Sequence, residues 1–214
     1  MEELRMYESG PSEVIMDVLL SNAFTAHPYR TPTVGWMDDL KRLTRTDAEE
    51  FFSRFYAPNN ATLAVVGDVN PAEVIKLAEK YFSDWKAKAI PSESMTAEPP
   101  QNSEKRISVF AKAQPIIRLG FHNPGIGSPD IYPLIMLGEI LSNGKTSRFY
   151  RNLVEGRQLA LYAAADSFYP GSRYPSLFLI SAAPKNPHTM EELENGVWAE
   201  INRLKKEPPT QWEM

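Results

Sequence analysis

The chain has 214 residues, 43% hydrophobic and 23% charged, a composition typical of one large or two small globular domains. A net charge of -4 and an isoelectric point near 5.5 exclude the basic surface that nucleic-acid binding requires. The sequence has no cysteine, which excludes disulfides and thiolate metal sites.

The sequence contains no apolar run of the roughly 18 residues that a membrane span needs. Its first residues are too acidic for a signal peptide. We therefore expect neither a membrane span nor a nucleic-acid partner, and the compartment stays open between periplasm and cytoplasm. Helical periodicity begins at residue 2 without an N-cap, so we expect the chain to be an internal piece of a longer parent.

The N-terminal part has helical periodicity with one interruption. Apolar residues at helical spacing predict two helices before residue 24, separated at Gly10-Pro11. A proline-stiffened loop over residues 27–32 follows. Residues 46–49 (Thr-Asp-Ala-Glu) have the pattern of a capping box and predict a helix that ends near Tyr56.

A strand and a helix are expected next. Residues 61–66 are a short apolar run between turn residues, which predicts a buried strand. Asn70-Pro71 is a typical helix start, and the helix should end near Phe82. Residues 91–103 are rich in proline and serine and predict an interdomain linker.

The second half mixes strands and helices. Strands are expected at residues 106–111, 116–121, 159–168 and 176–182, with the last two forming a hairpin. Helices are expected at residues 128–144 and 146–157, and a capping box at Thr189 predicts a last helix that covers a sheet.

This order of elements predicts an α+β fold of two layered domains, with helices packed on mostly antiparallel sheets. We expect the first domain to occupy residues 1–90 and the second to occupy residues 104–214, on either side of the linker at 91–103.

Five short phrases follow one another along the chain in a recognisable order. They are Glu2-Glu3-Leu4-Arg5-Met6, His27-Pro28-Tyr29, residues 55–63, Val66-Gly67-Asp68-Val69 and residues 143–155. Together they resemble the pitrilysin/insulinase-type zinc metallopeptidase family, which is related to mitochondrial processing peptidase. The resemblance implies that residues 1–90 are the C-terminal part of a first peptidase-like domain. Residues 104–214 would then be the N-terminal part of a second, noncatalytic one.

The family's catalytic motif, His-x-x-Glu-His, is absent from the chain. Only His27, His122 and His188 are present, and no two lie within one helical turn. The resemblance implies zinc in the intact parent, but we expect no tightly bound zinc and no catalytic or cofactor-binding residue in this chain. His27 is expected to pack and hydrogen-bond so as to fix its loop.

One metal ligand is implied by the resemblance. The family's third zinc ligand is a downstream glutamate in a Glu-Leu-x-Met phrase, which Glu3-Leu4-Arg5-Met6 matches. Glu3 is therefore the candidate ligand, and Glu2 is expected to support it or to face solvent. From spacing alone, Glu3 reads as one of many solvated helix glutamates.

The resemblance also implies what the parent does. A family member of this type is a zinc endopeptidase that cleaves peptides in a chamber between two halves. The expected partners are a peptide or unfolded polypeptide substrate and a second peptidase-like half. The substrate-holding arginine and tyrosine of that second half are Val154 and Leu161 here, so the chain fits the zinc-bearing half. The alternative is a noncatalytic scaffold or peptide-binding subunit of the same superfamily.

Overall fold

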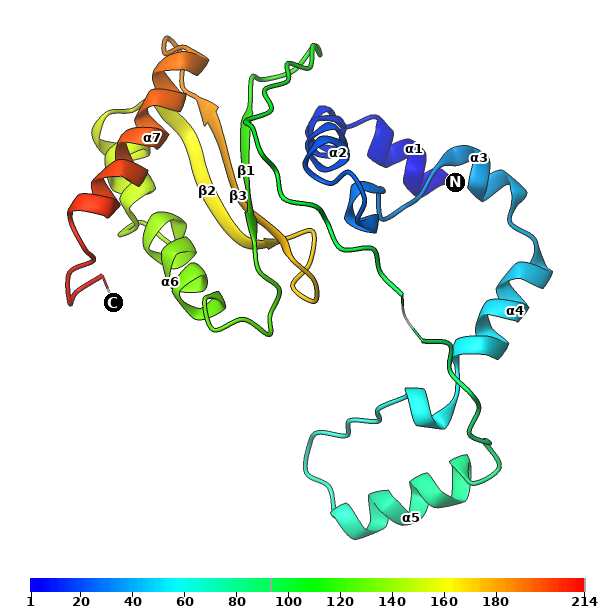
Figure 1. The fold of residues 1–214 in the computed structure, drawn as a ribbon. Coiled ribbons are helices and arrows are strands. Elements are labelled where there is room, and N and C mark those ends of the chain that lie inside the picture. The colour runs from blue at the N-terminus through cyan, green and yellow to red at the C-terminus, as the bar shows by residue number, and fades with distance from the viewer. Residues whose placement is uncertain (93, 214) are drawn as a thin grey trace. The chain divides into compact units, whose positions relative to one another are not determined.

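The computed structural model describes residues 1–92 and 94–213 (Figure 1). Contacts divide the chain into unit 1, made of Met1–Val34 and Thr96–Met214, and unit 2, made of Gly35–Met95. Unit 1 thus combines the N-terminal helices with the C-terminal sheet. The expected domains at residues 1–90 and 104–214 concern the longer parent, and that division stays a prediction.

Unit 1 is built on a three-stranded antiparallel sheet. Its strands are β1 (Ile117–Asn123), β2 (Ala160–Tyr169) and β3 (Ser176–Pro184), in the order β1-β3-β2. The β2–β3 pair is the expected hairpin, because Ala165 lies opposite Ile180 in an antiparallel register. Helices on an antiparallel sheet confirm the α+β class.

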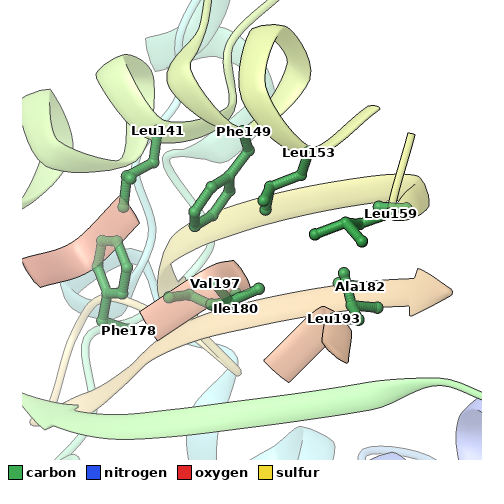
Figure 2. Packing of buried hydrophobic residues seen from close by; sticks show 10 residues of the cluster. Leu141, Phe149, Leu153, Leu159, Phe178, Ile180, Ala182, Leu193 and Val197 are labelled. Atoms are coloured by element: carbon green, nitrogen blue, oxygen red, sulfur yellow. The ribbon is translucent and has the colours of Figure 1, made fainter. Parts of the chain in front are cut away.

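The main core lies on one face of this sheet. There, α6 (Ile131–Ser142), the π-helix η3 (Tyr150–Gly156) and α7 (Met190–Lys206) cover the strands. Alternate residues of β3 point to this face, and Figure 2 shows Phe178, Ile180 and Ala182 among leucines of the helices. Successive side chains of a strand point to opposite faces, so the remaining β3 residues face the other side of the sheet.

The second face of the sheet is covered by α2 (Pro11–Ala23), and α1 (Glu2–Glu8) contacts α2. The two helices confirm the expected split at Gly10-Pro11. Met16, Leu20 and Phe24 pack on Leu177 and Leu179, the β3 residues that point away from the main core. The sheet is therefore a middle layer between two helical layers, as Figure 1 shows.

Local capping signals explain where several helices begin. Thr189 and Glu192 form the expected capping box of α7, which lies on β3 as expected. In unit 2, α5 (Pro71–Phe82) begins and ends at the expected residues, because the Asn70 side chain accepts a hydrogen bond from the Ala72 N–H. Unit 2 also contains α3 (Met37–Arg42) and the 3-10 turn η2 (Pro58–Asn60).

The capping box expected at residues 46–49 is wrong by two residues. Helix α4 (Arg45–Phe55) is capped by Thr44, whose hydroxyl accepts from the Asp47 N–H. The Asp47 carboxylate in turn accepts the Thr44 N–H at 2.7 Å. Thr46 also has an acidic residue three positions later, but that residue, Glu49, pairs with Arg45 at 2.6 Å, and the reciprocal pair forms at Thr44 and Asp47 instead.

Two expected strands are also wrong. Residues 61–66 and 106–111 form no strand, and residues 61–66 are exposed rather than buried. A strand is stabilised by hydrogen bonds to a neighbouring strand, and neither segment has such a neighbour among the described residues.

Within the described part of the chain, no helix is both long and apolar enough to cross a membrane.

Candidate functional site

The residues proposed from the sequence are not brought together. Glu3 is exposed on the first turn of α1, next to the buried Leu4. Glu2 forms an exposed ion pair with Arg5, at 2.5 Å between Oε1 and Nη1. Among residues 1–92 and 94–213, no three His, Cys, Asp or Glu side chains are grouped so that they could hold a metal ion. These residues alone do not fit a zinc centre, and the role of Glu3 stays a proposal about the parent.

His27 and His122 both lie against Phe24 in unit 1, whereas His188 lies at the start of α7. His27 is buried, its Nδ1 accepts the Tyr29 N–H, and its ring packs on Phe24 and Tyr29. His122 is exposed, with its ring 5.3 Å from that of Phe24. His188 precedes α7, where its Nδ1 lies 3.2 Å from Glu192 Oε2. His27 thus shapes its loop, as the sequence indicated.

The loop after α2 holds the carboxylate of Glu98, which lies in the segment at residues 91–103 that the sequence predicts to be a linker. Glu98 accepts hydrogen bonds from the N–H groups of Thr25, Ala26 and His27 and from the Thr25 hydroxyl, at 2.6 to 2.9 Å. Partial burial opposes the charge of Glu98, but these four donors outweigh it and lower its pKa to about 2. No local pattern predicts this contact, because it joins residues more than seventy positions apart.

A groove runs along β2 in unit 1. Its volume is about 630 Å³, and α6 and β2 supply most of its walls. The lining residues are Ile135, Gly138, Glu139, Ser142, Asn143, residues 164–168, Leu179 and Ser181. It therefore combines hydroxyl groups, apolar side chains and two acidic side chains, Glu139 and Asp166.

Direct contacts between α6 and β2 fix the shape of this groove. Ser142 Oγ donates to the Ala165 carbonyl at 3.2 Å, and Ser167 Oγ donates to the Leu134 carbonyl at 3.0 Å. A Cβ at Gly138 would lie 2.7 Å from Ser167 Oγ, so glycine allows the helix to approach the strand. The groove is a defined feature of the packing rather than a loop surface.

Polar contacts also order the groove's floor. Asp166 Oδ1 accepts the Phe168 N–H at 2.9 Å, which holds the carboxylate beside the strand. Ser181 Oγ accepts from Arg118, whose other terminal nitrogen donates to Ser12 in α2. Arg118 thereby links the sheet to the N-terminal helices behind the groove.

The two positions that depart from the family's second half serve packing and surface roles. Val154 in η3 packs against the main core. Leu161 is exposed at an irregularity of β2, where the register shifts between Ala160 and Tyr162. Neither side chain can donate the hydrogen bonds that arginine or tyrosine would give to a peptide.

Known proteins resemble the chain over most of its length. It is 31% identical over 213 residues to the zinc protease PqqE of Helicobacter pylori. The matched region covers 97% of this chain and 47% of that protein. A crystal structure of a protease from Helicobacter pylori matches with a TM-score of 0.89 at 31% identity, over 99% of this chain and 52% of that one. The chain therefore spans about half the length of these relatives.

Cytochrome b-c1 complex subunit 1 of Rattus norvegicus is 26% identical over 147 residues, which cover 67% of this chain and 30% of that protein.

The family itself follows from a match to most of the sequence. A family model described as the peptidase M16 inactive domain matches residues 42–214. This match and the bacterial zinc proteases confirm the resemblance carried by the five phrases. The chain belongs to the peptidase M16 inactive domain family.

Proposed function

We propose that the chain is a noncatalytic part of a longer zinc-dependent endopeptidase, and that its groove binds an extended segment of the peptide substrate. The observation that carries the proposal is the groove of about 630 Å³ between α6 and β2. Zinc and proteolysis are taken from the relatives named as zinc proteases. In the parent, Glu3 serves as one zinc ligand.

The backbone of β2 supports binding of an extended peptide. The strand lies at the end of the order β1-β3-β2, so one of its edges faces away from β3. Alternate residues along that edge have backbone N–H and C=O groups that can pair with a peptide strand.

The charges of the groove favour a particular peptide. Glu139 and Asp166 are the two charged residues of its lining, and both are acidic. A peptide that carries lysine or arginine beside apolar residues complements this lining. The groove thus selects by side chain while the strand edge binds the backbone.

Fluorescence anisotropy of a fluorescein-labelled peptide with alternating lysine and leucine tests the proposal. We expect the double variant Glu139→Gln/Asp166→Asn to bind on the order of 5- to 10-fold more weakly, the usual scale for two partly exposed charge pairs. Asparagine keeps an oxygen that can accept the Phe168 N–H, so the fold should be retained.

The matched control is Glu191→Gln, an exposed carboxylate in the first turn of α7. It should leave the affinity within about 2-fold, since it lies outside the groove lining. Equal affinity of the double variant and wild type, or no binding to wild type, would contradict the proposal.

A second candidate is a noncatalytic scaffold subunit. It is favoured by the similarity to cytochrome b-c1 complex subunit 1 of Rattus norvegicus. The sequence encoded by the parent gene distinguishes the two candidate functions, because an endopeptidase of this family requires the His-x-x-Glu-His motif and a scaffold does not.

A further inference from the structure

The chain contains two Asn–Gly sequences, Asn143-Gly144 and Asn195-Gly196, which lie in contrasting environments of unit 1. Both residues of the first pair are exposed, directly after the last residue of α6. The second pair lies inside α7, where Gly196 is buried. The same dipeptide therefore occurs once in an open turn and once in a packed helix.

An Asn–Gly sequence is chemically labile, because no side chain shields the backbone nitrogen that follows the asparagine. This nitrogen attacks Cγ of the asparagine, the Cγ–Nδ2 bond breaks, and ammonia leaves with the proton that the nitrogen loses. Water then opens the cyclic imide to aspartate or to its isomer isoaspartate. The reaction needs no enzyme or cofactor, but it needs a backbone that can turn until the nitrogen reaches Cγ.

The backbone at Asn143-Gly144 has this freedom. Asn143 is the C-cap of α6, with φ −81° and ψ 110°, so it has already left the helical conformation. Gly144 has a φ of +71°, and a Cβ built on it would meet nothing within 4 Å. The Gly144 N–H donates to no carbonyl among the residues that the structure describes. A turn of the backbone here therefore costs no hydrogen bond of that N–H and meets no steric barrier.

The backbone at Asn195-Gly196 lacks this freedom. Asn195 is exposed, but Gly196 continues α7, in which each N–H donates to a carbonyl one turn earlier. A Cβ at Gly196 would lie 3.0 Å from Leu159 Cδ1 and 3.1 Å from Leu153 Cδ2, so the helix packs closely on the core there. A turn of the backbone at this point would break the helix and separate it from both leucines.

The reactive pair also belongs to the groove. Asn143 is one of the lining residues, and its Nδ2 donates a hydrogen bond to Glu139 Oε2. Loss of ammonia removes this donor and leaves a carboxylate four residues after that of Glu139. Two like charges at this spacing repel each other, and a negative charge at the C-terminal end of α6 opposes the helix dipole. The groove then has a third acidic side chain beside Glu139 and Asp166.

We propose that Asn143 is a deamidation site, and that its conversion to aspartate or isoaspartate increases the negative charge of the groove. The product accumulates with the age of the protein, because the released ammonia is lost. A groove with a third carboxylate binds a lysine-containing peptide more tightly. This effect on binding rests on the proposed function, whereas the modification rests on the backbone at the end of α6 alone.

Peptide mapping by mass spectrometry tests the modification in the purified chain, sampled over time in mildly alkaline buffer. Trypsin cleaves after Lys145 and Lys185, so the two asparagines fall in different peptides. We expect Asn143 to show the mass of the amide-to-acid change at least about 10-fold faster than Asn195, where reaction first requires local opening of α7. In guanidinium chloride both should react at similar rates, because the fold is what protects Asn195. Equal rates in the folded chain would overturn the proposal.

Peptide binding tests the effect on the groove. Asn143→Asp should bind the fluorescein-labelled lysine–leucine peptide about 3- to 5-fold more tightly than wild type, the scale of one exposed charge pair. The matched control Asn195→Asp adds the same charge outside the groove lining and should stay within about 2-fold. Unchanged affinity of Asn143→Asp, or an equal gain in both variants, would refute the charge effect. The mapping needs no peptide, so its result is distinct from a failure of the proposed function.

Discussion

Glu3 is an exposed carboxylate in the first turn of α1, and the proposed function makes it a zinc ligand of the parent. If it is a zinc ligand in the parent, Glu3→Gln removes the charge that offsets Zn²⁺ but keeps the shape of the side chain. Loss of a residue that merely supports a ligand weakens metal binding about 10- to 100-fold, so we expect a larger loss here. Zinc content and peptide turnover of the purified full-length parent measure it.

Glu2 provides the control for this prediction, because it is the neighbouring residue and pairs with Arg5 at the surface. Glu2→Gln should leave zinc content and turnover nearly unchanged, since exposed pairs contribute little. Equal zinc content in the Glu3 variant and wild type would remove Glu3 from the site and favour the scaffold function.

At the scale of elements, Glu98 links the linker segment to the loop that follows α2. Its pKa is about 2 in the folded chain because of the four donors at residues 25–27, against an ordinary value of 4.5. A lowered carboxylate pKa stabilises the fold above the ordinary pKa, and this stabilisation is lost as the pH falls from about 4.5 toward 2. We therefore expect the Tm difference between wild type and Glu98→Gln to be largest above pH 5 and to shrink as the pH falls below about 4.5.

Thermal unfolding of both proteins between pH 7 and pH 3 measures this difference. Glu191→Gln is the control, because no such cluster of donors surrounds that exposed residue. A Tm difference that stays constant across the whole pH range would show that the Glu98 charge is not what ties the linker to the loop.

Elements with local signals were predictable, and elements with distant partners were not. Helix α5 is confirmed at both ends, because Asn70, Pro71 and the apolar spacing all lie within the segment. The strand expected at residues 61–66 is wrong, because a strand depends on a neighbour and none is present in the described chain. The sequence does not predict the groove for the same reason, because its walls depend on contacts between distant residues such as Ser142 and Ala165. The small and polar residues of β2, Ala163 to Ser167, were its only sequence signal.

At the scale of the whole molecule, the layered core of unit 1 contrasts with the exposed apolar side chains of unit 2. The sheet of unit 1 is covered on both faces, by α6 and α7 on one side and by α2 on the other. Among the described residues of unit 2, Ala57 alone is buried. Unit 1 should therefore retain its structure in the isolated chain, whereas chemistry that needs the rest of the parent should be lost.

The isolated chain should accordingly neither hold zinc stoichiometrically nor cleave peptides. A catalytic zinc site needs three converging protein donors and an open position for water. Glu3 supplies one carboxylate, and His27, the histidine that is buried, uses Nδ1 to accept the Tyr29 N–H. Metal analysis after dialysis should give well below one zinc per chain, and a quenched peptide should stay intact with added zinc. The full-length parent, measured in parallel, is the positive control. One zinc per isolated chain, or zinc-dependent cleavage by it, would mean that this half carries a complete site after all.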